Sequence, residues 1–274
     1  TPPDETLVEL ARRGRLANED ELERQTRRML ADPRAESLAT RFASQWLRLQ
    51  DLEKVNPDAQ LYPYFNYQLK EAMKRETELL FHYIVQEDRS VMDLVDADYT
   101  FVNEQLAAHY KIPGVTGNDF RRVDLVDDNR RGLLGQSSIL MMTSHANRTS
   151  PVLRGKWVME VLLGSPPPPP PPGVPDLDET GASEGARTLT TRERMEKHRA
   201  NPACNSCHSV IDPIGLALDN FDVTGAWRIK ENLTPIDPAG VLYDGTPISG
   251  PAGLRNSILA RSTVFKRTLA KNLM

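Results

Sequence analysis

The two cysteines of the chain stand three residues apart and are followed at once by a histidine, in the run Cys204-Asn205-Ser206-Cys207-His208. Two thiols at this spacing can form thioether bonds to the two vinyl groups at one porphyrin edge, and the histidine can bind the iron. The sequence therefore predicts one covalent haem c, attached through Cys204 and Cys207, with His208 as the proximal ligand. Pro213, a little further along, is an additional candidate for contact with the haem.

Two other chemistries use closely spaced cysteines. Structural zinc requires four ligands, and the sequence has no second cysteine pair at finger-like spacing to complete them. A redox-active dithiol requires the strand pattern of a thioredoxin-like fold before the motif, whereas the residues before Cys204 have a helical pattern. Haem attachment is the interpretation that the spacing favours.

The ligand on the opposite side of the haem has several candidates. His198 lies shortly before the motif, where a helix leading into the attachment segment could bring it across the haem face. The apolar segment 139–145 offers Met141, Met142 and His145 as alternatives, and an open sixth position is a further one. The choice matters because methionine raises the haem potential relative to a second histidine. His82 and His109 stand in a helical region and are expected to have structural roles.

Acidic residues near the motif suggest no second site. Asp212, Asp219 and Asp222 could surround calcium, but their spacing matches no EF-hand loop. We expect them to cap surface turns.

The elements that must position the haem ligands are mostly helices. Apolar residues recurring every three or four positions predict helices, and Gly or Pro punctuates them. Helices are predicted within 4–55 and over 66–86, 102–110, 151–163, 190–200 and 252–273. A short strand is predicted at 122–125, turns at Asp212-Pro213 and Gly215, and a hairpin at 240–250. The seven prolines at 166–172 predict a polyproline II rod of about 20 Å.

These elements predict a mainly α fold in three parts. Residues 1–112 form a helical domain, and 113–187 form an irregular and helical connection that contains the proline rod. Residues 188–274 form a small haem domain like that of class I cytochromes c, with a minor β-hairpin. The chain opens with Thr1 and ends within a helical pattern, so we expect it to be trimmed at both ends from a longer precursor.

Composition limits the possible partners. The 274 residues carry a net charge of −4 with no basic stripe, so no nucleic-acid partner is expected. No apolar run is long enough to span a membrane, and the chain has no signal peptide at its start.

Several blocks of the sequence resemble the large multidomain cytochrome c-type proteins of planctomycetes, whose segments are domains of unknown function. The blocks are RRMLADPRAESLATRFASQWL (27–47), SVMDLVDADYTFVNEQLAAHY (90–110), RTSPVLRGKWVMEVLLGSPPPPPPP (148–172), HRANPACNSCHSVIDPIGLALDNFDVTGAWR (198–228) and DGTPISGPAGLR (244–255). The resemblance implies export, haem attachment in the periplasm, and a histidine at the place of His198. The methionines of segment 139–143 depart from the family pattern.

The leading functional hypothesis is a monohaem electron-transfer module of the periplasm, or a subunit of a larger membrane-associated redox complex. Its partners would be redox proteins and, in the second case, a membrane complex. One alternative is a haem enzyme of the peroxidase or oxidase type with an open sixth position. Another is a structural subunit that docks the cytochrome onto its complex.

Overall fold

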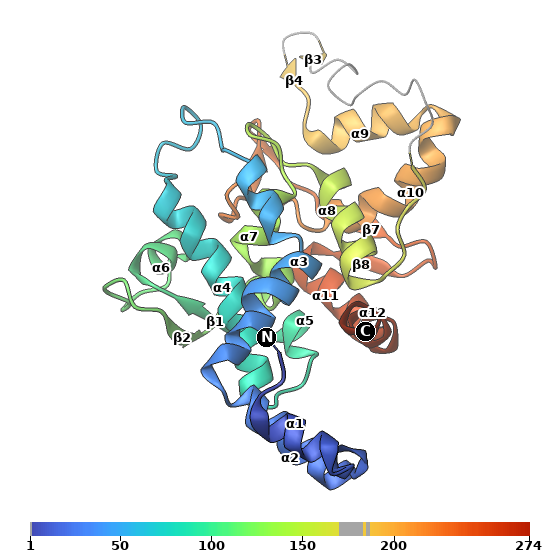
Figure 1. The fold of residues 1–274 in the computed structure, drawn as a ribbon. Helices are drawn as coiled ribbons and strands as arrows, with labels where there is room; N and C mark the ends of the chain where they lie inside the picture. The colour runs from blue at the N-terminus through green and yellow to red at the C-terminus, as the bar shows by residue number, and fades with distance from the viewer. Residues whose placement is uncertain (1, 170–182, 185–186) are drawn as a thin grey trace.

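The computed structural model describes residues 2–169, 183–184 and 187–274 and shows a mainly α-helical protein, which confirms the predicted fold class. In Figure 1 the first two helices project from the lower end of the molecule, and α9 and α10 lie at its upper right. No helix in the described ranges combines the length and the apolar character needed to cross a bilayer.

The α-helices follow the chain in this order: α1 (Glu5–Arg12), α2 (Glu19–Leu30), α3 (Ser44–Trp46), α4 (Tyr67–Gln86), α5 (Asp93–Asp96), α6 (Glu104–Tyr110), α7 (Ser137–Met142), α8 (Pro151–Trp157), α9 (Thr191–Arg199), α10 (Pro202–Leu216), α11 (Gly250–Ala260) and α12 (Ser262–Leu273). Two π-helical segments, Leu38–Ala43 and Val158–Leu162, join α3 and α8 respectively. Short 3-10 helices lie at Arg15–Ala17, Pro33–Glu36, Leu49–Lys54, Asp128–Arg130 and Leu133–Gly135.

Among the described residues, the strands form four separate antiparallel pairs: β1 (Tyr99–Val102) with β2 (Arg121–Asp124), β3 (Ser183–Glu184) with β4 (Arg187–Thr188), β5 (Lys230–Glu231) with β6 (Thr234–Pro235), and β7 (Ala239–Val241) with β8 (Pro247–Ser249). In the first pair Tyr99 is opposite Asp124, and in the last Ala239 is opposite Ser249. The last pair is the hairpin that the sequence predicts at 240–250.

The helix predicted over 66–86 is α4, which runs through the N-terminal part of the molecule. Asn66 caps its first turn by accepting a hydrogen bond from the Leu69 amide. One carboxyl on its buried face, that of Glu76, is 1% exposed and accepts hydrogen bonds from Thr100 and Tyr110, each at 2.6 Å. The helix therefore buries a polar network together with apolar side chains.

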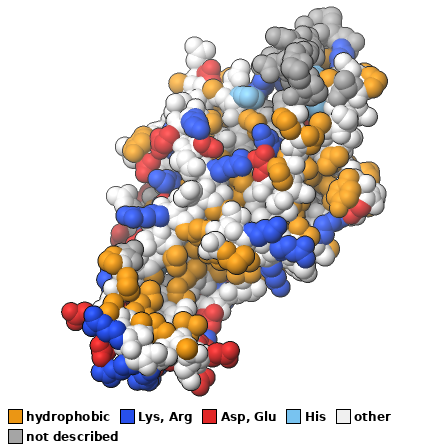
Figure 2. Space-filling model, turned by 45° about the vertical axis from the view of Figure 1, so that its right-hand side comes forward, with side chains coloured by type: hydrophobic (Ala, Val, Ile, Leu, Met, Phe, Trp, Pro, Cys, Tyr) orange, Lys and Arg blue, Asp and Glu red, His pale blue; other side chains and the backbone are white. Residues whose placement is uncertain are grey.

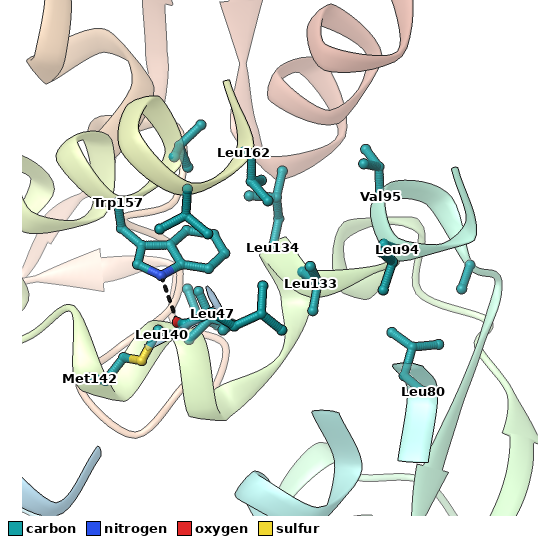
Figure 3. Close-up of a cluster of buried hydrophobic side chains, with 14 of the residues drawn as sticks. Leu47, Leu80, Leu94, Val95, Leu133, Leu134, Leu140, Met142, Trp157 and Leu162 are labelled. Atoms are coloured by element: carbon teal, nitrogen blue, oxygen red, sulfur yellow. Dashed lines mark hydrogen bonds between the residues drawn. The ribbon is translucent and has the colours of Figure 1, made fainter. Parts of the chain in front are cut away.

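One continuous cluster of buried apolar side chains holds the elements together (Figure 3). It includes residues from each of the three predicted parts, such as Leu47, Leu134 and Phe265. At its centre the Trp157 indole N–H donates to the Leu47 carbonyl at 3.1 Å, a bond between segments far apart in the sequence. The division into three parts and the likeness of 188–274 to a class I cytochrome c stay predictions.

The close crossing of α8 and α10 depends on two glycines. A Cβ on Gly215 would lie 1.8 Å from the Pro151 carbonyl oxygen, and one on Gly155 would lie 2.3 Å from the Ile211 carbonyl oxygen. At each of these two positions the backbone of one helix packs directly against a carbonyl of the other, so no residue larger than glycine fits there. This contact fixes the C-terminal half of α10 against α8.

A buried arginine holds the segment that follows α10. Arg154 on α8 is 1% exposed and donates to the carbonyls of Leu218, Phe221 and Asp222 at 2.7, 2.7 and 2.8 Å. Burial lowers the pKa of its guanidinium to about 10, so the group stays charged at neutral pH. Three backbone acceptors are satisfied by one side chain.

The structure corrects several local predictions. Asp212-Pro213 and Gly215 are not turns but lie inside α10, with Pro213 in the helix interior. The helix predicted over 252–273 is interrupted at Arg261, and the one over 151–163 turns π-helical at Val158. The approach to α6 is strand β1, which pairs with the predicted strand at β2. Pro166–Pro169 form neither helix nor strand, and the remaining prolines of the predicted rod lie outside the described residues.

Candidate haem site

The two cysteines and His208 lie in the first two turns of α10. Cys207 follows Cys204 by three positions and His208 follows it by four, so on a helix the three side chains share one face. Cys204 is buried, Cys207 is half-buried, and both are free thiols. One part of α10 therefore carries two thiols and an imidazole.

The second histidine comes from α9, whose start is well defined. Thr190 and Glu193 form a capping box, in which each side chain bonds to the backbone of the other residue. The carboxylate of Glu231 also accepts hydrogen bonds from the amide and hydroxyl of Thr191, at 2.8 and 2.7 Å. These contacts fix α9 so that its last turn carries His198 inward, where it is 7% exposed.

The imidazole rings of His198 and His208 are in edge-to-face contact. Their centroids lie 4.8 Å apart and the ring planes are inclined by 68°. In Figure 1, α9 and α10 adjoin at the upper end of the molecule, and Figure 2 shows histidine side chains in that region. Of the proposed sixth ligands, His198 is therefore the one that the structure brings into contact with His208.

A buried carboxylate orients the proximal histidine. The His208 Nδ1 atom lies 2.8 Å from Oδ1 of Asp212, one turn further along α10. Because a carboxylate can only accept, this bond places the ring proton on Nδ1 and leaves the lone pair on Nε2. Asp212 is completely buried, so the prediction that it caps a surface turn is wrong. The structure thus provides the orienting partner that metal-binding histidines normally have.

Electrostatics around the second ring favour its neutral form. Burial lowers the pKa of His198, the neighbouring His208 lowers it further, and Asp212 acts in the opposite direction. A neutral imidazole keeps the lone pair that a metal requires. His198 is thus suited to bind iron at neutral pH.

The other candidates lie elsewhere. Met141 and Met142, on α7, pack in the hydrophobic core, and Figure 3 shows Met142 beside Leu47 and Trp157. His145 is exposed in a turn whose amide bonds to the Arg148 carbonyl. These three residues occupy surroundings different from those of the facing rings.

Pro213 and the remaining histidines have packing roles. Pro213 faces β7, where a Cβ on Gly240 would lie 2.9 Å from the proline ring. The His109 Nε2 atom lies 2.9 Å from the Thr224 carbonyl, and burial lowers the pKa of this histidine. Burial also lowers the pKa of His82 on α4.

Asp219 and Asp222, which the sequence predicts in surface turns, accept hydrogen bonds in the structure. Asp219 is 2% exposed and accepts from Thr149 and Arg228, so its surface assignment is also wrong. Asp222 accepts from Thr224 and Ala226, as a turn residue does. None of these contacts involves a metal-binding geometry.

These residues fit a covalent haem better than a zinc ion. The donor set comprises two thiols and two facing imidazoles, one of them backed by a carboxylate, which matches thioether attachment with two axial histidines. Structural zinc needs a closed group of four ligands. Within the described ranges, no group of three or more His, Cys, Asp or Glu side chains is arranged to hold a metal ion.

Comparison with known protein families gives two matches. Residues 1–112 match the family described as "PSD4: Protein of unknown function (DUF1592)", and residues 130–231 match "PSCyt3: Protein of unknown function (DUF1588)". Domains of these two kinds occur in planctomycete-type multidomain cytochrome c proteins. The second match contains α8, α9 and α10, and therefore both facing histidines. No curated protein and no solved structure matches the chain.

Sequence reasoning found both cysteines and both histidines but missed Asp212. The Asp-Pro pair was interpreted as a turn signal. The four-residue interval between His208 and Asp212 was the available clue, because on a helix it brings the two side chains together.

Proposed function

We propose that the chain carries one haem c, attached through Cys204 and Cys207 with His208 and His198 as axial ligands, and that it transfers single electrons in the periplasm. The observation that supports this most directly is that α9 brings His198 beside His208 and the cysteines of α10. The two rings would move apart to admit the iron between them. The match to domain families of multidomain cytochromes c agrees with a redox role. The haem would supply a reversible one-electron couple.

The protein's own residues would bind and orient this group. The thiols of α10 would fix one porphyrin edge, and the buried Asp212 carboxylate would hold the His208 ring in the orientation and tautomer required for iron. His198 would close the opposite face, so that small molecules such as peroxide would have no open position. This arrangement favours electron transfer over the enzymatic alternative.

The test is to produce the chain in the periplasm of a host that has haem c maturation proteins. We expect covalent haem by mass analysis, and optical and EPR spectra of a six-coordinate low-spin iron that does not react with peroxide. Replacing both cysteines by serine should abolish covalent attachment. Unmodified thiols in the wild-type chain would disprove the proposal.

The distal ligand has its own test. His198→Ala should convert the iron to a high-spin form that binds cyanide, because no second imidazole would remain beside the haem. His82→Ala is the matched control, since His82 lies on α4 and should leave the spectrum unchanged. A low-spin spectrum in the His198 variant that is identical to wild type would exclude His198 as the ligand.

A further inference from the structure

The Asp212 side chain is an isolated buried acid with an incomplete set of partners. It is 0% exposed, and Oδ1 contacts the His208 Nδ1 atom at 2.8 Å. Its second oxygen, Oδ2, has no hydrogen-bond partner in the part of the chain that the structure describes. The Arg199 Nε atom lies 3.7 Å from Oδ2, which is an ion-pair distance without a hydrogen bond.

Burying such a carboxylate lowers the stability of the fold unless its charge interacts with another group. An ionised group is unfavourable to bury with one hydrogen bond and a cation beyond hydrogen-bond distance. An asparagine would fill the same space without a charge. Packing alone therefore does not explain an acid at this place, and the acid contacts the His208 ring.

We infer that Asp212 is a positioning residue that sets the reduction potential of the proposed haem through His208, and that Arg199 limits its effect. This inference rests on the proposed function. A carboxylate that accepts a hydrogen bond from Nδ1–H makes the imidazole a stronger electron donor to iron and so stabilises the ferric state. The potential falls as a result.

Arg199 acts on the same charge from the other helix. Its guanidinium partly neutralises Asp212, since Nε faces the oxygen that has no hydrogen-bond partner. The residue directly follows His198, so α9 carries both the distal ligand and the group that moderates the proximal one. The two substitutions should consequently move the potential in opposite directions.

The experiment measures the midpoint potential of the purified holoprotein by spectroelectrochemical titration. Asp212→Asn keeps the shape and removes the charge, and we expect a change of about tenfold or more in the reduction equilibrium, equal to a rise of about 59 mV for one electron. Arg199→Gln should lower the potential. Its effect should shrink in the Asp212→Asn background, because the charge that it moderates is gone.

Two further variants separate this role from general packing. Asp212→Glu retains a carboxylate and should return the potential toward the wild-type value. Asp219→Asn removes another buried acid, one that contacts Thr149 and Arg228 instead of a histidine, and should leave the potential unchanged. In the iron-bound protein, ¹⁵N NMR of His208 should show a weaker Nδ1 hydrogen bond in Asp212→Asn.

The outcomes are distinguishable. If the wild-type chain takes up no haem, the proposed function fails. If haem is bound with two histidines but Asp212→Asn shifts the potential no more than Asp219→Asn does, this inference alone fails. Shifts of the same sign in the Asp212 and Arg199 variants would also overturn it. If Asp212→Asn does not take up haem, Arg199→Gln decides, and an unchanged potential refutes the inference.

Discussion

The free energy of unfolding should fall as pH rises from about 4.5 to about 7 because of one buried acid, Glu76. Burial raises the pKa of its carboxyl from an ordinary 4.5 to about 7, although hydrogen bonds from Thr100 and Tyr110 act in the opposite direction. Between these two values the folded chain holds a proton that the unfolded chain has released. The stabilisation is complete below pH 4.5 and is lost as pH approaches 7.

The size of the effect follows from that interval. At about 1.4 kcal/mol for each pH unit, the full loss is about 3 kcal/mol. Urea unfolding followed by tryptophan fluorescence, at several values between pH 5 and pH 8, measures most of this range. The difference in unfolding free energy between wild type and Glu76→Gln should fall by about 2–3 kcal/mol from pH 5 to pH 8.

A second variant tests the cause. Thr100→Val removes a donor whose 2.6 Å hydrogen bond stabilises the ionised form of Glu76, so the loss of stability should extend to higher pH. The reasoning is refuted if the difference between wild type and Glu76→Gln is independent of pH, or if it grows as pH rises.

Three further substitutions probe the contacts that position α10, each measured as the urea unfolding free energy. Arg154→Met removes three charge-assisted hydrogen bonds to carbonyls, two of which keep a backbone amide partner, and should cost about 3–5 kcal/mol. A loss below about 1 kcal/mol would contradict the hydrogen-bond network. Gly215→Ala forces α8 and α10 apart and should lower the unfolding free energy by about 3 kcal/mol. Gly253→Ala is the control: its Cβ would make only ordinary contacts at 3.6 Å or more, so stability should change by at most about 1 kcal/mol. Equal effects of the two substitutions would exclude the close crossing of α8 and α10. Trp157→Phe keeps most of the packing but deprives the Leu47 carbonyl of its donor, so a loss of about 1–3 kcal/mol is expected, and no loss would show that the bond is dispensable.

The sequence was most informative where local pattern and tertiary packing agree. The apolar periodicity over 66–86 predicted α4 almost to the residue, and the glycine and proline punctuation around 240–250 predicted the β7–β8 pair. Cys204, Cys207 and His208 were found because their spacing alone has a chemical meaning.

Local signals failed where packing overrides them. Pro213 and Gly215 normally end helices, yet α10 continues through both, because Gly215 is the point of closest approach to α8 and the helix is held by that contact. No helix was predicted over 202–216, so Asp212 was not recognised as a partner of His208. A pattern that depends on contacts between distant helices cannot be found by reading one segment at a time.

The anchoring of α9 has a consequence for how this family of sites can diversify. His208 belongs to α10, a helix held against α8 by the paired glycines. His198 belongs to α9, which is held by Glu231 and by the hydrogen bond from Arg192 to the Asp237 carbonyl. Substitutions at Glu231 or Arg192 would therefore move His198, while Cys204 and Cys207 on α10 would keep their places. Such a chain could gain an open coordination position, and with it new reactivity, through changes remote from the cysteine motif.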